Sequence, residues 1–163
     1  MHEKERIPIE KLEGYGCFAC GTANPIGLDM HFYRCGDEIC SDVTLKKYYE
    51  GWENMAHGGI ISALLDEIMS WAVIYFKRVF FVTRKMEVKY VRPVPIGSPL
   101  RVKGFLRNGK ERNAIRAGAE ITTEDEVILA RASGEYVELS RERLDAVPES
   151  LKKEMQKLFD RLD

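Results

Sequence analysis

The sequence lacks a marked excess of charge of either sign, and it lacks a targeting signal. Its 163 residues contain 25 Lys and Arg against 26 Asp and Glu, so no basic footprint points to nucleic acid. Residues 1–14 are charged and contain no apolar run, which argues against a signal peptide. We expect no stretch to span a membrane. These absences predict a cytoplasmic protein with neither nucleic-acid nor membrane partners.

Cysteine is scarce, and its spacing is ambiguous. The four cysteines form two pairs, Cys17 with Cys20 and Cys35 with Cys40. Two such pairs can indicate a zinc site. However, Cys35 and Cys40 flank a predicted hairpin turn and are spaced more loosely than the ligands of a zinc knuckle. Because thiols stay reduced in a reducing compartment, we expect no metal and no cofactor, with zinc as the alternative.

The order of predicted elements favours one domain, with a core over about residues 17–139 and a helical extension over 140–163. A chain of this length can bury a real core. Residues 1–14 are expected to be a polar lead-in. Asn108-Gly109 predicts a two-residue hairpin turn. Alternating apolar and polar residues predict strands over 28–33, 39–43, 82–91, 100–107, 115–121 and 127–139.

The stretch from His57 to Phe76 is apolar on nearly all sides, which predicts a buried helix. Its few polar residues, Ser62, Asp66 and Ser70, are four apart and share one face. A carboxylate without partners is costly to bury, so this stripe indicates a function. Glu67 lies about 100° round the helix from Asp66, so we expect it to be structural or at an interface. One buried helix with five or six antiparallel strands predicts an α+β fold in which a sheet wraps around the helix.

Two glycines open this helix, and they favour a binding site for a developing negative charge. Gly58 and Gly59 carry no side chain to keep a ligand from the backbone. The N–H groups of a first helical turn lack partners within the helix, and the helix dipole favours negative charge there. This arrangement stabilises an oxyanion if a carbonyl can reach it. The alternative is an ordinary glycine-rich helix start, but Asp66, nine residues after His57, favours the functional interpretation.

These motifs resemble those of the hotdog-fold acyl-CoA thioesterases of the phenylacetyl-CoA (PaaI-like) group. The matching segments, in the order of that family, are Cys17-Phe18-Ala19-Cys20-Gly21, Asn24-Pro25-Ile26-Gly27-Leu28, His57-Gly58-Gly59, Leu64-Leu65-Asp66 and Tyr90-Val91-Arg92-Pro93-Val94-Pro95. The resemblance covers roughly residues 17–139. It implies the hotdog fold and the hydrolysis of an acyl-CoA thioester without a cofactor. It also accounts for Cys17 and Cys20 without a metal.

The resemblance implies a role for each residue of the catalytic site. Asp66 would activate water or attack the thioester. The N–H of Gly59, with that of Gly58 as the second candidate, would hold the carbonyl together with His57. Thr83 would assist from the next strand. In the predicted strand, Thr83 lies on the same face as the charged residues Lys85, Glu87 and Lys89. It can therefore face the core only through a β-bulge, unless that face of the strand contacts a partner subunit.

The contacts to the rest of the substrate are less clearly marked. We predict that Asn54, Ser62 and Arg92 bind substrate. Some family members carry an Asn six residues before the His, where this chain has Gly51. The sequence contains no phosphate-loop pattern that would mark a CoA site, and it does not specify the acyl group.

Helix geometry predicts how the chain assembles. Gly59 and Asp66 are seven residues apart, about 10 Å along an α-helix, too far for one Asp side chain to reach a carbonyl at Gly59. A two-fold homodimer solves this if each site takes His57 and Gly59 from one chain and Asp66 from the other. The resemblance implies the same shared site. A homotetramer, as a dimer of dimers, stays open.

Two other functions on the same fold also stay open. One is a hotdog dehydratase or hydratase, which also pairs a histidine with a helix carboxylate but resembles a His-Phe-Pro loop rather than His-Gly-Gly. The other is a non-catalytic acyl-CoA-binding protein. The presence of both His57 and Asp66 favours the thioesterase over these two.

Overall fold

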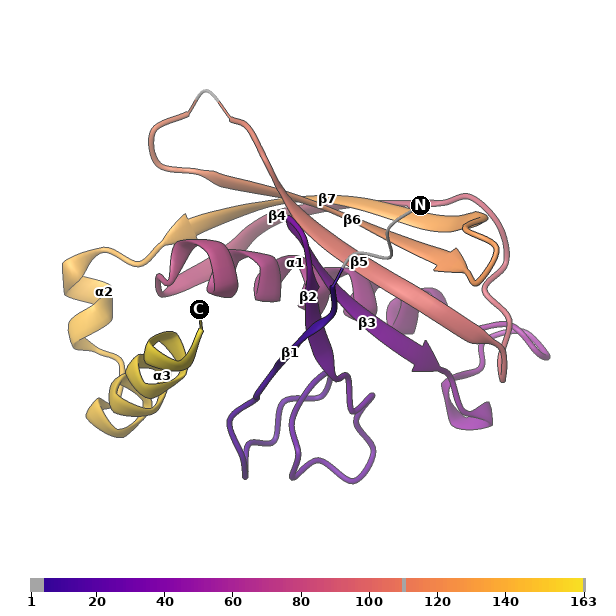
Figure 1. Cartoon of the computed structure of the whole chain (residues 1–163), viewed down its shortest axis with the longest axis horizontal. Coiled ribbons are helices and arrows are strands. Elements are labelled where there is room, and N and C mark those ends of the chain that lie inside the picture. Colours follow the sequence, from indigo (N-terminus) through magenta and orange to yellow (C-terminus); the bar gives the residue numbers. More distant parts are fainter. Residues whose placement is uncertain (1–4, 110, 163) are drawn as a thin grey trace.

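The protein is an antiparallel sheet wrapped around one long helix (Figure 1). The computed structural model describes residues 5–109 and 111–162. In these residues the seven strands follow the order β1-β2-β3-β5-β6-β7-β4, and all neighbours are antiparallel. The strands are β1 Ile7–Ile9, β2 Phe32–Cys35, β3 Glu38–Thr44, β4 Phe81–Tyr90, β5 Pro99–Arg107, β6 Ile115–Thr123 and β7 Ile128–Glu138. The helices are η1 Lys47–Tyr49, α1 Gly58–Lys77, α2 Arg141–Asp145 and α3 Glu149–Arg161.

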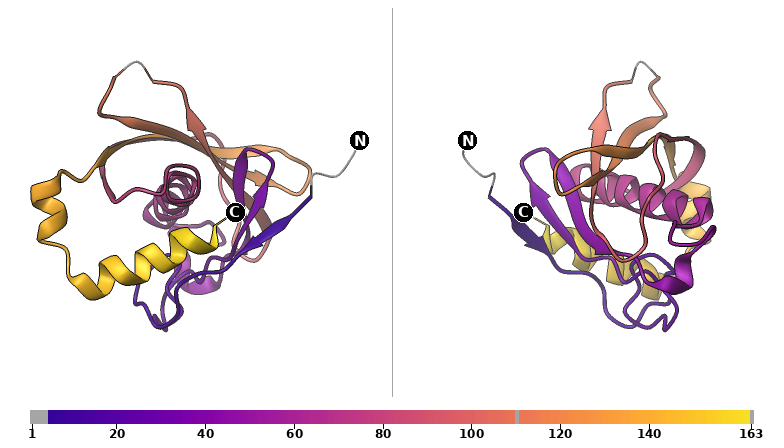
Figure 2. Two further views of the ribbon diagram at one scale, coloured as in Figure 1. Left: turned by 60° about the vertical axis from the view of Figure 1, so that its left-hand side comes forward. Right: turned by 90° about the vertical axis from the view of Figure 1, so that its right-hand side faces the viewer.

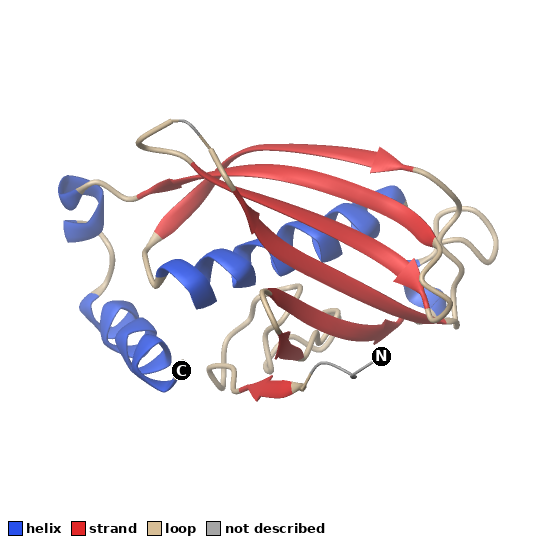
Figure 3. Ribbon diagram, turned by 45° about the horizontal axis from the view of Figure 1, so that its top comes forward, coloured by secondary structure: helices blue, strands red, loops and turns tan. Residues whose placement is uncertain are grey.

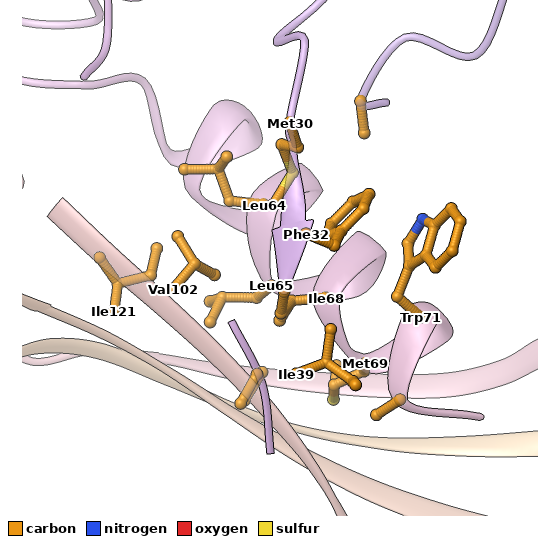
Figure 4. Packing of buried hydrophobic residues seen from close by; sticks show 14 of the residues in the cluster. Met30, Phe32, Ile39, Leu64, Leu65, Ile68, Met69, Trp71, Val102 and Ile121 are labelled. Atoms are coloured by element: carbon orange, nitrogen blue, oxygen red, sulfur yellow. The ribbon is translucent and has the colours of Figure 1, made fainter. Parts of the chain in front are cut away.

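The core is centred on α1, because this helix carries apolar side chains on nearly all sides. Figure 2 (left) looks along α1 and shows the sheet curving over it, with α3 across from the sheet. Figure 4 shows the α1 side chains meeting those of the strands. The fully buried residues of α1 are Leu64, Leu65, Ile68, Met69, Ala72 and Val73. At Gly104 of β5 a Cβ would overlap the carbonyl oxygen of Ile68, so the sheet comes this close to the helix only because residue 104 is glycine.

By length and composition alone, α1 is apolar enough to cross a membrane. The expectation that no stretch would qualify was therefore wrong. A core helix of a soluble protein meets the same criteria. Here half of the apolar stretch of α1 is buried, and the helix packs mainly against β5 and β6 (Figure 3, helices blue and strands red).

The predicted strands and the long helix are confirmed to within a few residues, with two differences near the N-terminus. The predicted lead-in contains β1, which pairs with β2 through Ile9 and Phe32. Three residues are too few to show a periodicity, so the sequence did not reveal this strand. The strand predicted from Leu28 begins only at Phe32, because the N–H groups of Leu28 and Met30 bond to loop carbonyls instead of a neighbouring strand.

In the second half of the chain, the helical C-terminal extension is confirmed, whereas the predicted two-residue turn was wrong. Asn108-Gly109 does not form a two-residue turn, because residues 108–114 separate β5 from β6. The C-terminal extension forms two helices, with Pro148 at the N-cap of α3. Residues 1–4, 110 and 163, on which parts of the predicted lead-in, turn and extension fall, lie outside the described residues.

Candidate active site

A β-bulge in β4 turns Thr83 toward the central helix. Thr83 pairs with Tyr136 of β7, whereas Lys85 pairs with Glu135, so one extra residue lies between them on β4. Tyr136 is fully buried and faces the core, and Thr83 shares its side of the sheet. The bulge, one of the two explanations offered for the alternation pattern, is therefore confirmed.

Asp66 lies on α1 with its carboxylate between two hydroxyl groups. Thr83 Oγ1 donates to Asp66 Oδ1 at 3.3 Å, and the Tyr136 hydroxyl approaches the same oxygen at 3.4 Å. Burial raises the pKa of Asp66, and the hydrogen bonds from Thr83 and Tyr136 partly oppose that rise. Sequence reasoning missed Tyr136, because the strand pattern describes it only as a core aromatic. The pairing of Tyr136 with Thr83 is what identifies it.

The stripe predicted on α1 forms a polar seam against β4 and β7. Ser62 Oγ lies 2.8 Å from the Tyr90 hydroxyl, which in turn donates to the Gly58 carbonyl at 3.1 Å. Ser70 lies near the Tyr136 hydroxyl and slightly opposes the rise in the pKa of Tyr136 that burial causes. We define the polar seam as Ser62, Asp66, Ser70, Thr83, Tyr90 and Tyr136. Since β4 is the edge strand of the sheet, the seam lies at the sheet's open edge.

His57, the N-cap residue of α1, accepts a hydrogen bond from the first turn of the helix. The N–H of Gly59 donates to His57 Nδ1 at 2.9 Å. A ring nitrogen that accepts a hydrogen bond carries no proton, so the neutral ring keeps its proton on Nε2 and can donate from there. The Gly59 N–H, our first choice as oxyanion donor, is thus already engaged. Among the described residues, Gly58 N–H has no acceptor, so the assignment passes to Gly58.

A surface cavity of about 420 Å³ lies beside this helix start. It is lined by Gly51, Trp52, Ala56, His57 and Gly58. Trp52, at the wall of this cavity, is 81% exposed. Gly51 lines the cavity without a side chain, and a Cβ there would lie 3.0 Å from the Cα of His57. Both remaining candidate donors, His57 and the Gly58 backbone, therefore line a space large enough for a small ligand group.

The other two predicted substrate residues hold loops in this structure. Asn54 adopts the left-handed backbone region with φ 61°, and its side-chain oxygen accepts from Lys47 at 3.5 Å. Arg92 Nη1 donates to the Ile128 carbonyl at 2.8 Å. Neither contact joins these residues to the polar seam. Their roles in substrate binding stay predictions.

A different face of α1 carries Glu67, which meets the loop that contains Cys17 and Cys20. The Trp71 indole N–H donates to Glu67 Oε1 at 3.0 Å, and Cys17 Sγ lies 3.9 Å from the same oxygen. Among the described residues, this is the one group of His, Cys, Asp and Glu side chains close enough together to hold a metal ion. These contacts tie the loop to the helix, as the structural role predicted for Glu67 requires.

The sequence and the fold were each compared with those of known proteins. The sequence model of the thioesterase superfamily matches residues 53–129, and none of the curated proteins matches this chain. Among solved structures, a thioesterase superfamily protein is 25% identical with a TM-score of 0.70. That match covers 76% of this chain but only 60% of the other.

Two more distant structures share the fold. The PaaI protein from the phenylacetic acid degradation operon of E. coli is 16% identical with a TM-score of 0.62, over 69% of this chain and 81% of that one. A hypothetical thioesterase from Streptococcus pneumoniae, solved with coenzyme A, is 18% identical with a TM-score of 0.62, over 68% and 86%. The chain therefore has the hotdog fold, and over residues 53–129 it shares the sequence pattern of the thioesterase superfamily.

Proposed function

We propose that this protein hydrolyses an acyl-CoA thioester to a free acid and CoA. The observation that carries the proposal is Asp66, a partly buried carboxylate held by the hydroxyls of Thr83 and Tyr136. Within the described residues no Lys, Arg or His forms an ion pair with Asp66, so burial dominates and raises its pKa. A raised pKa makes the carboxylate a stronger base toward water.

The reaction needs a polarised carbonyl and an activated nucleophile. The Gly58 N–H and His57 Nε2–H would donate to the thioester oxygen as it becomes an oxyanion. Water would attack the carbonyl carbon while Asp66 takes its proton, and collapse of the intermediate would break the C–S bond. The CoA sulfur would leave as a thiolate and take up a proton. Asp66 as direct nucleophile, through a mixed anhydride that water then hydrolyses, is the alternative route.

We propose that the site is shared between two chains. Gly58 and Asp66 are eight residues apart on α1, about 12 Å at 1.5 Å per residue, so one chain does not bring both to the same carbonyl. The edge strand β4 is ten residues long and unpaired on one side within the described residues. It exposes Val82 and Tyr90, which are 44% and 53% accessible. Such an edge favours pairing with a second chain, and a two-fold axis there supports a homodimer.

Complementation tests the shared site. His57→Ala and Asp66→Ala proteins, each inactive alone, are mixed and allowed to exchange subunits. In a mixed dimer one shared site carries both lesions and the other carries none, so about a quarter of the parent activity should return with random pairing. If native mass spectrometry confirms exchange and no activity returns, each site lies within one chain. The same spectra would distinguish a dimer from a dimer of dimers.

The substrate class rests on comparison and on the cavity. The related pneumococcal structure holds coenzyme A, and the cavity beside Gly58 has room for a small acyl group. A thiol reagent with a short panel of acyl-CoAs tests the reaction directly. A dehydratase would release no thiol, and a non-catalytic acyl-CoA-binding protein would bind without turnover. We also propose a cytoplasmic location.

A further inference from the structure

A second group of reactive side chains lies one residue beyond Asp66 on α1, and the proposed hydrolysis does not use it. Glu67 meets Cys17 and Cys20, which belong to the loop that precedes β2. Cys17 Sγ lies 3.9 and 4.0 Å from the two carboxylate oxygens. One ligand atom from each of the three side chains lies within 4.8 Å of the others. Two sulfurs and one oxygen therefore surround a common point.

These separations suit a tetrahedral metal ion. Zinc binds thiolate sulfur at about 2.3 Å and carboxylate oxygen at about 2.0–2.2 Å, so ligand atoms in a tetrahedral site lie about 3.5–3.8 Å apart. The Cys17–Glu67 distance of 3.9 Å is close to this range. The wider limit of 4.8 Å can be closed by small side-chain rotations. Two thiolates in the ligand set favour a soft divalent cation over magnesium or calcium.

Among the described residues, none supplies a positive charge to Glu67. Its hydrogen-bond partners are the Trp71 indole and the two thiols, which are neutral donors. No Lys, Arg or His of residues 5–109 and 111–162 forms an ion pair with it. A divalent cation would supply the charge that this carboxylate lacks.

The loop presents both thiols without rearrangement of its backbone. Cys17-Phe18-Ala19-Cys20-Gly21 has the two-residue spacing of many zinc-binding cysteine pairs. The Gly21 N–H bonds to the Cys17 carbonyl at 2.9 Å, closing the turn. A Cβ at Gly21 would overlap the Tyr15 carbonyl oxygen, so this tight turn requires glycine. The turn is held from outside as well, because the Leu28 N–H bonds to the Phe18 carbonyl at 2.8 Å.

We propose that Cys17, Cys20 and Glu67 bind one Zn²⁺ ion, with water as the fourth ligand. The ion fastens the loop to α1 beside the catalytic Asp66, and binding releases the protons of both thiols. Cys35 and Cys40 take no part, because they lie on the β2–β3 hairpin. This site replaces the sequence expectation of reduced thiols without metal. It stands independently of the proposed hydrolysis, since no zinc ligand takes part in that reaction.

The test measures how many zinc ions the full-length chain binds. Protein purified with a reductant is stripped by a chelator, given Zn²⁺, and measured by native mass spectrometry. One ion per chain is expected in the parent protein and in the matched control Cys35→Ser. Cys17→Ser and Glu67→Gln should each weaken zinc binding by more than the factor of about 10–100 that is typical for loss of an outer-shell partner.

Cobalt substitution and thermal unfolding provide independent measurements. Co²⁺ should give thiolate-to-cobalt charge-transfer absorption in the parent protein and in Cys35→Ser, and this absorption should be lost in Cys17→Ser. Cys17 is exposed, so the metal-free Cys17→Ser protein should unfold at the same temperature as the metal-free parent. Zinc should raise the Tm of the parent and of Cys35→Ser, but not that of Cys17→Ser. The proposal is overturned if the reduced parent protein binds no zinc. It is also overturned if Cys17→Ser binds zinc as well as the parent does, or if Cys35→Ser loses it.

Discussion

The backbone N–H of Gly58 can be removed without deleting any side chain. Proline at this position lacks the N–H, and proline is well tolerated at the first residue of a helix. The preceding His57, with φ −62° and ψ 138°, already has the backbone that a residue before proline prefers. An added Cβ would lie 3.5 Å from the Tyr90 hydroxyl oxygen, an ordinary contact. Gly58→Pro should therefore fold.

The expected loss is large and falls on kcat. Removal of one oxyanion donor typically lowers kcat by about 10²–10³, or about 2.7–4 kcal/mol of transition-state stabilisation. Gly58→Ala is the matched control, because it adds a Cβ but keeps the N–H. Steady-state thiol release from an acyl-CoA gives kcat and KM for both variants, and circular dichroism with thermal melting checks the fold.

Two outcomes would refute this reasoning. If Gly58→Pro keeps the kcat of Gly58→Ala, the N–H at position 58 is not an oxyanion donor. A change confined to KM would mean that the N–H binds the ground state and the transition state equally. In either case the N–H of Gly58 would not supply the transition-state stabilisation that the mechanism assigns to it.

Two other contacts lead to predictions of different kinds. Thr83→Val removes the hydroxyl that donates to the Asp66 carboxylate. If Asp66 acts as proposed, kcat should fall about 2–12-fold, the equivalent of a hydrogen bond worth about 0.5–1.5 kcal/mol, whereas Thr83→Ser should stay near the parent. Equal rates in Thr83→Val and the parent would remove Thr83 from the mechanism. Gly104→Ala should destabilise the fold by about 1–3 kcal/mol or more in urea unfolding, because its Cβ overlaps the Ile68 carbonyl. The control Gly16→Ala, with nothing within 4 Å of its Cβ, should unfold like the parent, and equal stability of both variants would count against the close approach of β5 to α1.

The long helix and most strands could be predicted because their signals are local. The apolar run after His57 and the alternation in β5, β6 and β7 need only neighbours in sequence. The bulge at Thr83 could also be anticipated. The proposed role of Thr83 requires its hydroxyl to face the core, whereas the alternation pattern places it on the same strand face as charged, outward-facing residues. It then took the pairing with Tyr136 to confirm the bulge.

The rest of the candidate site depends on contacts between distant segments. Tyr136 lies 70 residues from Asp66, and only the sheet brings them together. The choice between Gly58 and Gly59 depends on the orientation of the His57 ring, which no spacing encodes. Likewise, Asn108-Gly109 is a sequence typical of two-residue hairpin turns. It does not form one here, because β5 ends at Arg107 and β6 begins only at Ile115, which leaves a longer loop between them.

Replacement of Asp66 is the most direct test of the proposed thioesterase. Asp66→Ala and Asp66→Asn are each compared with the parent for thiol release from acyl-CoA, for affinity toward the same acyl-CoA by calorimetry, and for thermal stability. Both variants should lose turnover while folding and binding acyl-CoA much as the parent does, because the carboxylate acts in the chemical step. Turnover near the parent rate in either variant would make Asp66 a structural residue and would contradict the proposed mechanism.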